Sequence, residues 1–393
     1  MRKIYFILFL FFISFQNLNS QSLQLSVYSE VSIITVGPGN EFFETFGHSA
    51  IRIKDPVLNF DLVYNYGMFN FNQPNFYANF AKGRLLYRLG RYPFHIFVKN
   101  NNKDHRWIKQ QVLDLNQQEK QAFFQFLENN ALPQNADYYY DPYFDNCATK
   151  LRDITKEILG NRVQFPDDYA SKNLTLRQLM NKELPWNHWG SFGINLALGT
   201  KLDKTATPAE YMYLPDYVFT AFKDAEKNEN GITKPLIKKE IDVLSYPENK
   251  TSIVWYNPLL IFSILLLIAI VITYKDLKSQ KQSKWFDFIV FFFTGILGVL
   301  IAFLWFFTDH KTTPNNFNFL WAFAPNIIIA FLFFKKKLPS WMKYYIRVCC
   351  LLLFVLVIIW VLKIQLFSLT IIPILLMLIL RYYFLNKLLS SEE

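Results

Sequence analysis

The sequence predicts an exported α+β domain followed by an all-α membrane domain of five helices. Three observations lead to this fold class. The chain begins with a short basic and apolar segment, its middle mixes strand-like and helix-like patterns, and its last third consists mainly of long apolar runs. We therefore expect a signal peptide at 1–20, the exported domain at 21–250 and the membrane domain at 255–393.

The N-terminal segment has the layout of a secretory signal. Arg2 and Lys3 precede an apolar run from Ile4 to Phe15, and a polar stretch then ends at Ser20. This run is shorter than the roughly 20 residues that cross a bilayer, which favours a cleaved signal over an uncleaved anchor. In both cases the next segment is exported. The expected cleavage site near Ser20 has no cysteine, so the sequence does not indicate a lipoprotein.

The exported region combines strand and helix signals. The strand-like segments, which end in turn residues, are 26–40, 44–55 and 60–71. Residues 116–131 form an amphipathic helical pattern, with Phe123, Phe124 and Leu127 on one side. A second helix is expected at 145–160. Asp145 or Asn146 suits its N-cap, and Gly160 suits its end.

The C-terminal region contains five apolar runs of membrane-spanning length. They are 257–273, 285–307, 317–334, 344–362 and 365–385. The loops 275–284 and 335–343 carry four lysines each, and the loop 308–316 carries one. The positive-inside rule places the lysine-rich loops in the cytoplasm. The exported domain and the loop 308–316 then lie outside, and the C-terminus lies inside.

The net charge of +10 belongs almost entirely to the membrane region. Residues 250–393 contain 14 Lys and Arg but only five Asp and Glu, so they supply nine of the ten charges. The basic balance therefore reflects membrane loops, and we do not expect a nucleic-acid partner.

Cys147 is the only cysteine in the first 348 residues, so the exported domain cannot form an internal disulfide. At helical spacing, the thiol shares a face with Leu151, Ile154 and Ile158. A helix N-terminus lowers the pKa of a thiol, because free N–H groups and the helix dipole stabilise the thiolate. The sequence is thus compatible with a nucleophilic cysteine or with a buried structural one.

A thiol nucleophile needs a base, and His48 has the best sequence context for that role. It follows Gly47 at the start of a strand-like run, whereas His95 and His105 lie in a polar, Asn-rich stretch. His188 lies between two tryptophans. A strand-borne His facing a helix-borne Cys is the arrangement of papain-like enzymes, here in permuted order. The alternative for His48 is a structural histidine hydrogen-bonded to a turn.

A third group usually orients the histidine. The returning strand offers Asp61 and Asn65, which we rank equally because the sequence does not reveal the strand register. We expect four further residues on the substrate-binding side: Asn146, Tyr64, His310 and Asn316. No metal or cofactor is expected, because the exported domain has no cluster of cysteines and no His pair with metal-ligand spacing.

Several blocks of the chain resemble the Lnb family of Bacteroidetes membrane proteins. They are GPGNEFFETFGHSAIRIKD (37–55), VYNYGMFNF (63–71), FYANFAKGRLLYRL (76–89), DNCATKLRDI (145–154) and the outer loop DHKTTPNNFNFLWAFAPN (309–326). The resemblance extends over nearly the whole chain after the signal. It implies a permuted papain-like periplasmic domain joined to a five-helix transmembrane domain in the inner membrane.

The resemblance also implies an activity, the N-acylation of lipoproteins. Cys147 would accept an acyl chain from a membrane phospholipid as a thioester, with His48 as the general base. The free α-amine of a lipoprotein's lipidated N-terminal cysteine would then take the chain. The expected partners are therefore membrane phospholipids and lipidated lipoproteins.

Two other functions remain open at this stage. A papain-like cysteine amidase or peptidase acting on cell-wall peptide would use the same two residues. In a non-catalytic envelope assembly protein, both residues would be structural. The membrane spans and the aromatic-rich segment 186–198 favour acyl transfer, since the donor chain and the acceptor are both held in the bilayer.

Overall fold

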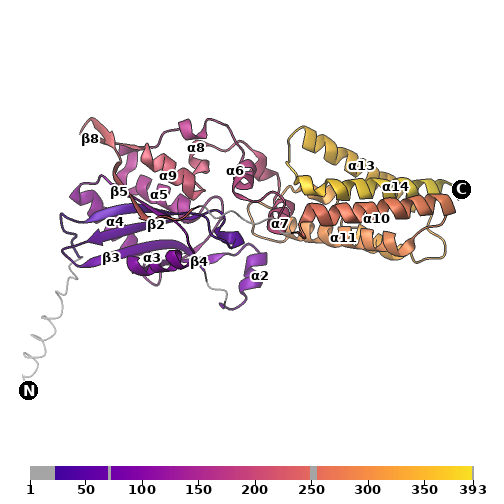
Figure 1. Ribbon diagram of the computed structural model, residues 1–393, viewed down its shortest axis with the longest axis horizontal. Coiled ribbons are helices and arrows are strands. Elements are labelled where there is room, and N and C mark those ends of the chain that lie inside the picture. The colour runs from indigo at the N-terminus through magenta and orange to yellow at the C-terminus, as the bar shows by residue number, and fades with distance from the viewer. Residues whose placement is uncertain (1–22, 70–71, 248–254, 392–393) are drawn as a thin grey trace, which may run out of the picture.

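A sheet-containing domain and a bundle of long helices make up the two ends of the molecule (Figure 1). The computed structural model describes residues 23–69, 72–247 and 255–391. The signal peptide expected at 1–20 lies outside these residues. The predicted fold class, an α+β domain followed by a helical membrane domain, is confirmed.

Seven antiparallel strands form the main sheet, in the order β10-β5-β1-β2-β3-β4-β6. They are β1 (Glu30–Val36), β2 (His48–Asp55), β3 (Phe60–Met68), β4 (Leu86–Pro93), β5 (Ile108–Leu113), β6 (Asp137–Tyr139) and β10 (Ile237–Leu244). Every residue of β1 after Glu30 is buried, as expected for a central strand that is covered on both faces.

Helices cover both faces of this sheet. One face packs against α4 (Gln117–Asn130), α5 (Cys147–Leu159) and α9 (Pro215–Lys223), and the other against α3 (Phe94–Lys103). The two helices predicted at 116–131 and 145–160 are confirmed as α4 and α5. Their starts are set by the side chains of Asn116 and Asn146, which accept hydrogen bonds from backbone N–H groups of the first turn.

Short elements complete this domain. A small sheet has the order β7-β8-β9. The short elements are η1 (Phe42–Glu44), α2 (Phe76–Ala81), η2 (Gly160–Arg162), β7 (Val163–Gln164), η3 (Asp168–Ala170), α6 (Leu176–Glu183), α7 (Trp189–Ala197), η4 (Thr200–Asp203), α8 (Pro208–Tyr211), β8 (Glu226–Glu229) and β9 (Ile232–Pro235). Of these, α7 lies beside the membrane bundle (Figure 1).

Four helices among the described residues are long and apolar enough to cross a membrane. They are α10 (Pro258–Ser279), α11 (Lys284–Phe306), α13 (Met342–Val361) and α14 (Ile372–Ser391), the last preceded by η6 (Leu369–Ile371). Many of their large apolar side chains are exposed, as in Leu267, Phe293 and Phe354. In a bilayer these side chains would contact lipid.

The segment 317–334, predicted as one of the five membrane spans, is not a single continuous helix. That segment contains only η5 (Phe317–Leu320) and α12 (Asn326–Leu332), with Pro325 between them. Proline cannot donate the backbone hydrogen bond that a continuous helix requires. The seven residues of α12 rise only about 10 Å, far less than the roughly 30 Å of a bilayer core.

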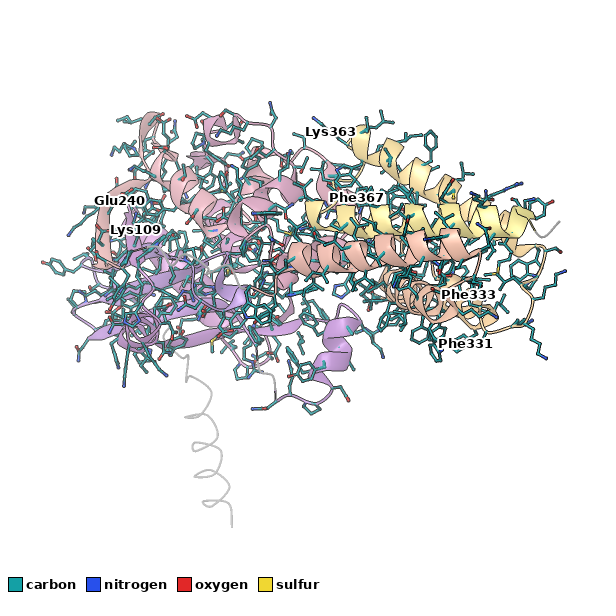
Figure 2. All side chains as sticks on the ribbon, turned by 45° about the vertical axis from the view of Figure 1, so that its right-hand side comes forward. Lys109, Glu240, Phe331, Phe333, Lys363 and Phe367 are labelled. Carbon is teal, nitrogen blue, oxygen red and sulfur yellow. The ribbon has the colours of Figure 1, made fainter. Side chains whose placement is uncertain are left out.

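The broken segment nevertheless connects the two ends of the bundle. It packs along α11, and the Lys284 ammonium donates to the Lys335 carbonyl at 2.6 Å. Figure 2 shows Lys363 and Phe367 at the bundle end that meets the sheet domain, and Phe331 and Phe333 towards the other end. The described chain therefore runs along the bundle five times. Irregular backbone is tolerated at this depth only where protein surrounds it.

A buried ion cluster joins three of the membrane helices. Arg381 on α14 bonds both carboxylate oxygens of Asp287 on α11, at 2.8 and 3.0 Å. It also bonds Asp276 and Thr273 on α10, at 2.9 and 3.0 Å. Charges inside a membrane protein are costly unless they are paired, so this cluster specifies how α10, α11 and α14 pack.

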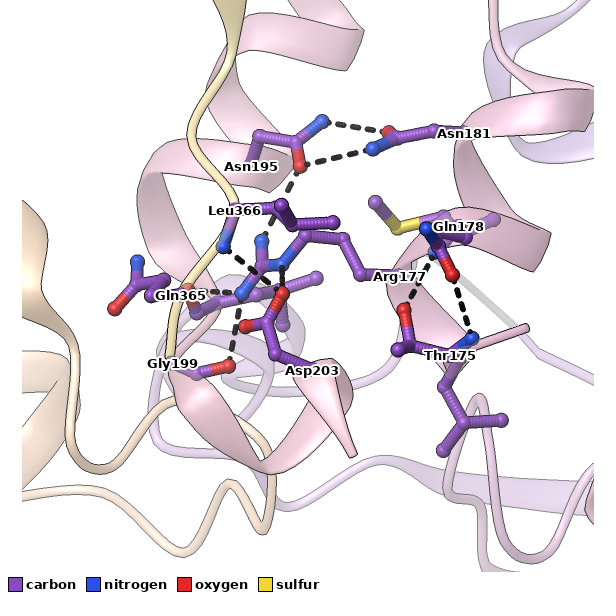
Figure 3. Close-up of polar contacts among 12 residues, drawn as sticks. Thr175, Arg177, Gln178, Asn181, Asn195, Gly199, Asp203, Gln365 and Leu366 are labelled. Carbon is purple, nitrogen blue, oxygen red and sulfur yellow. Dashed lines mark hydrogen bonds and ion pairs between the residues drawn. The ribbon is translucent and has the colours of Figure 1, made fainter. Parts of the chain in front are cut away.

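The junction between the two domains is built around a second buried charge pair (Figure 3). Arg177 on α6 and Asp203 on η4 are 2.8 Å apart and almost fully buried. Arg177 also donates to the carbonyls of Leu198 and Gly199, and Asp203 accepts from the backbone N–H of Leu366 at 3.0 Å. Because Leu366 lies between α13 and α14, this pair links the sheet domain to the bundle.

Candidate active site

Cys147 is the first residue of α5 and is 7% exposed. The preceding residue, Asn146, caps the helix by accepting from the N–H groups of Ala148 and Thr149, both at 2.9 Å. The sulfur receives backbone hydrogen bonds from Ser49 and Ala148. Sequence and cap thus place the thiol at a helix N-terminus, in the electrostatic environment that favours a thiolate.

His48 is the first residue of β2 and is hydrogen-bonded to Cys147. The two side chains meet where the strand and the helix both begin. Burial by itself lowers the pKa of His48 and raises the pKa of Cys147. The attraction between the two charges and their hydrogen bond outweigh burial, so the pKa of His48 is raised and the pKa of Cys147 is lowered. Both shifts favour a thiolate–imidazolium pair.

Asn65 on β3 contacts the other side of the imidazole. Its Oδ1 lies 2.5 Å from Nε2 of His48, and its Nδ2 donates to the Tyr92 hydroxyl at 2.9 Å. The register pairs Arg52 with Val63, so the side chains of Asn65 and His48 lie on the same face of the sheet. With Nε2 engaged by Asn65, Nδ1 is the ring nitrogen left for the thiol.

Asp61 lies away from this site. It pairs with Lys54 in the strand register, six residues from His48 and therefore about 20 Å along the strand. Its carboxylate accepts two hydrogen bonds from Arg52, at 2.7 and 2.6 Å. The register thus separates Asn65 and Asp61, which the sequence ranked equally, and only Asn65 reaches the histidine.

Tyr64 also does not reach the thiol. Side chains alternate along a strand, so Tyr64 points to the opposite face from its neighbour Asn65. Its hydroxyl donates to Glu128 on α4 at 2.5 Å, and Arg91 donates to the same carboxylate at 2.6 Å. Tyr64, expected on the substrate-binding side, therefore lies fully buried in the core between the sheet and α4 and α5.

The two asparagines expected to bind substrate have structural contacts instead. Asn146 uses its Oδ1 for the helix cap, and its Nδ2 donates to the carbonyls of Pro142 and Tyr213, both at 2.8 Å. Asn316 is fully buried at the domain junction, where its Nδ2 donates to the Leu196 carbonyl at 2.7 Å. Both amides are thus occupied by protein partners.

His310 lies in the loop after α11, where its Nε2 is 3.1 Å from the Phe80 carbonyl oxygen. Of the four residues expected on the substrate-binding side, it alone lines the cavity described below. Burial lowers the pKa of its imidazole, against the effect of backbone hydrogen bonds at Phe80 and Ala81.

The acidic residues before Cys147 are engaged in local contacts. Asp141 Oδ1 accepts from the N–H groups of Tyr143 and Phe144, at 3.0 and 3.1 Å. Asp145 forms an ion pair with Lys150 at 2.8 Å. These partners offset the carboxylate charge that would otherwise oppose a thiolate.

Arg106 is a residue of the site that the sequence did not reveal. It is 7% exposed, its Nε donates to the Gly37 carbonyl at 2.9 Å and its Nη1 to Glu44 at 3.1 Å. Gly37 directly follows Val36, the strand partner of His48. Arg106 interacts electrostatically with Cys147 and His48. Its Nη2 is buried without a hydrogen-bond partner among the described residues.

The comparisons with known proteins identify both domains. A model of the Lnb N-terminal periplasmic domain matches residues 14–182, and a model of the Lnb transmembrane domain matches residues 248–392. The chain belongs to the Lnb family. No curated protein and no solved structure matches it.

This Lnb-family protein is thus an inner-membrane protein with a periplasmic domain. The match to the periplasmic domain includes His48, Asn65 and Cys147. Among the described residues, no group of three or more His, Cys, Asp and Glu side chains has the arrangement of a metal site.

Proposed function

We propose that this protein is an acyltransferase that N-acylates the lipidated N-terminal cysteine of lipoproteins. The observation that carries this proposal is the placement of Cys147 at a helix start, hydrogen-bonded to His48, in a domain attached to a transmembrane bundle. A strand-borne His that precedes a helix-borne Cys in the chain is the order of a permuted papain-like site. Family membership supports a role in lipoprotein maturation.

The first half-reaction forms a thioester. The Cys147 thiolate, whose proton His48 holds on Nδ1, attacks the carbonyl carbon of a phospholipid ester. The ester C–O bond breaks, and the leaving alkoxide takes the proton from His48. The products are acyl-Cys147 and a lysophospholipid. Asn65 keeps the imidazole ring in the orientation for both proton transfers.

The second half-reaction releases the acyl chain. The α-amine of the lipoprotein's N-terminal cysteine attacks the thioester carbonyl, and His48 accepts the proton that the amine loses. The C–S bond breaks, an amide forms and the thiolate of Cys147 returns. Splitting acyl transfer in this way lets two lipids use one site in turn.

The helix start offers a donor for the tetrahedral oxyanion in both half-reactions. The N–H groups of Ala148 and Thr149 are bound by Asn146. The first N–H groups of a helix have no acceptor inside the helix. The N–H of Cys147 itself is therefore the donor that we assign to the oxyanion.

The position of the periplasmic domain at the membrane suits lipid substrates. Trp186, Trp189, Trp255 and Tyr256 are exposed, and Trp189 donates to the Tyr256 carbonyl at 2.6 Å, just before α10. Tryptophan and tyrosine are enriched where a protein meets the bilayer surface. A soluble cell-wall peptide would require neither this aromatic group nor the bundle.

We also propose which end of the membrane bundle faces the cytoplasm. The lysine-rich loops 275–284 and 335–343 contact each other through Lys284 and Lys335. Both lie at the bundle end away from the periplasmic domain (Figure 1). By the positive-inside rule this end is cytoplasmic, and the C-terminus of α14 lies at the same end (Figure 1).

Lipoprotein N-termini provide the test. The chain is expressed in cells that lack their own N-acylating enzyme, and the N-termini of lipoproteins are determined by mass spectrometry. Triacylated products should appear with the wild type and vanish with Cys147→Ala, a loss of orders of magnitude. Acylation that persists in the variant would exclude Cys147 as the nucleophile. Cleaved cell-wall peptide without acylation would instead support an amidase.

A further inference from the structure

A cavity of about 280 Å³ lies between the periplasmic and transmembrane domains. Its lining comes from three separate chain segments, 83–85, 139–142 and 309–312. The first two belong to the periplasmic domain, and the third is the loop that follows α11. The cavity therefore exists only where the two domains meet, at the periplasmic end of the membrane bundle.

The loop after α11 forms one side of this cavity and is hydrogen-bonded to the segment before Gly83. The backbone N–H of Asp309 donates to the Lys82 carbonyl at 2.8 Å, beside the contact of His310 with Phe80. Gly83 has a φ of +78°, and a Cβ there would lie only 2.5 Å from the backbone nitrogen of His310. The close approach of the two loops thus depends on glycine at this position.

The lining segment 139–142 lies close to the nucleophile in the chain. Asp141 and Asp145 exchange two backbone hydrogen bonds of 3.1 Å, and Cys147 follows two residues later. The Tyr140 ring lines the cavity and interacts electrostatically with Cys147. A Cβ placed on Gly67 would lie 3.3 Å from that ring and 3.8 Å from the Cβ of Cys147. Tyr140 is therefore shared by the cavity and the thiol site.

The cavity carries two cations in weak pairs. Arg84 lies 2.8 Å from Asp309, and these side chains are 58% and 61% exposed. Lys311 lies 3.9 Å from Asp141. The first pair is exposed to solvent and the second is at the limit of ion-pair distance, so both are weak and an entering anion can take the place of either carboxylate. Arginine and lysine are the usual partners of phosphate groups in proteins.

One exposed aromatic side chain, Tyr139, lines the same cavity, and further exposed apolar side chains belong to residues near its lining segments. Leu86 and Tyr139 are paired across β4 and β6, and both are exposed. Tyr77 and Phe80 on α2 are also exposed, and the Phe80 carbonyl contacts His310 of the cavity wall. Polar and apolar contacts are thus available side by side, as an amphipathic lipid requires.

We infer that this cavity binds the phosphate-bearing headgroup of the phospholipid that donates the acyl chain. The inference rests on the proposed function and names the part of the site that selects the donor. Its volume lies just below the range of roughly 300–1,000 Å³ that holds a drug-sized ligand, so it accommodates a headgroup but not two acyl chains. With the phosphate held by Arg84 and Lys311, the ester carbonyl, a few bonds away, extends past Tyr140 towards Cys147.

The test measures thioester formation on Cys147 by the full-length protein in detergent micelles. Each sample contains phosphatidylethanolamine or a diacylglycerol with the same acyl chains but no phosphate. We expect the wild type to react at least about tenfold faster with the phospholipid. Arg84→Gln combined with Lys311→Gln should remove this preference, so that the two lipids react at similar rates. A double variant that keeps the preference would overturn the inference.

A matched control uses Arg88, which is as exposed as Arg84 and forms an ion pair with Asp137 but does not line the cavity. Arg88→Gln should retain the preference for the phospholipid, and its loss there would count against the assignment. Inorganic phosphate in the same assay separates a lipid site from a site for the free ion. Inhibition by millimolar phosphate that is equal with the phospholipid and with diacylglycerol would identify the latter and overturn the lipid assignment.

A failure of this inference is distinguishable from a failure of the proposed function. If the wild type forms no thioester with either lipid, although iodoacetamide still alkylates Cys147, both proposals fall. If the wild type forms the thioester at equal rates from both lipids, the proposed function stands and the headgroup site is wrong.

Discussion

The Oδ1 atom of Asn65 lies 2.5 Å from Nε2 of His48, although the two residues come from different strands. This contact directs the other ring nitrogen towards Cys147 and identifies the third member of the candidate site. It also leads to a direct prediction, because its loss leaves the cysteine and the histidine in place.

Asn65→Ala should slow thioester formation by roughly 10- to 100-fold. The imidazole would lose its orientation but not its basicity, so the effect should be smaller than the loss of a general base, which contributes about 10²–10⁴-fold. The measurement is the single-turnover rate of acylation. Asp61→Asn, on the same face of β3 but paired with Arg52, should keep a near wild-type rate. Equal effects of the two changes would exclude the orienting role.

The thiol of Cys147 should react as a thiolate below the ordinary thiol range. Its pKa is lowered by His48, so alkylation by iodoacetamide should continue as the pH falls below the usual thiol pKa of about 8.5. His48→Ala removes the partner charge and leaves burial, which raises the pKa of Cys147. The alkylation profile should therefore move to higher pH. His95→Ala, an exposed histidine, should not change it, and identical profiles for all three proteins would refute the ion pair.

Arg106→Gln and Glu44→Gln should move the alkylation profile of Cys147 in opposite directions. Both changes break the same 3.1 Å contact, but the first removes a positive charge near the thiolate and the second removes the negative charge that offsets it. Arg106→Gln should raise the pKa of Cys147, and Glu44→Gln should lower it. A purely structural role for the contact predicts a shift in the same direction for both.

Two other titratable groups, Asp104 and Tyr138, interact with Arg106 or Cys147, but neither affects this comparison. Asp104 also interacts with Arg106 and is present in both variants, so it does not affect the comparison. Tyr138 interacts with Cys147, but burial raises the pKa of its hydroxyl, which keeps this tyrosine neutral over the range used. Arg106→Lys retains the charge and should restore most of the wild-type profile.

Arg177→Ala should strongly destabilise the junction between the domains. It leaves the buried carboxylate of Asp203 without its charged partner, which costs about 3–5 kcal/mol. The measurement is the thermal midpoint of the detergent-solubilised protein. Arg88→Ala removes a pair exposed at the surface and should lower the midpoint much less, because solvent screens exposed charges. Similar midpoints for the two variants would show that the buried pair does not stabilise the junction.

Gly83→Ala should reduce thioester formation from phospholipid by separating the two loops at the cavity. Gly231→Ala is its matched control, since both glycines have positive φ values, +78° and +85°, and both variants incur backbone strain of about 1–2 kcal/mol. A Cβ on Gly231 meets no atom within 4 Å, whereas one on Gly83 meets His310. Equal losses in the two variants would attribute the effect to strain alone.

The outline of the fold and the first two site residues could be predicted because their signals are local. The cap at Asn146 and the periodicity after it define where α5 starts, and a thiol at that start has a distinctive environment wherever the helix packs. His48 was chosen for its place at the start of a strand. Apolar length and lysine content were enough to find four of the membrane helices.

The remaining features depend on contacts between distant segments. Asn65 and Asp61 have the same parity on β3, so only the pairing with β2 separates the residue that reaches His48 from the residue bound by Arg52. Arg106 has no motif, and its role arises where the loop before β5 meets the loop before β2. In the segment 317–334, Pro325 breaks a run that composition alone predicts as a helix.

The sequence by itself determined a two-part molecule, an exported domain and a membrane bundle, with a thiol at a helix start. Short-range periodicity, capping and hydrophobic length specify these features. The tertiary structure alone decided which polar residue orients His48, which charges surround Cys147 and where the membrane loop meets the periplasmic domain. These features depend on strand register and on the packing of segments that are as distant in the sequence as Arg84 and Asp309.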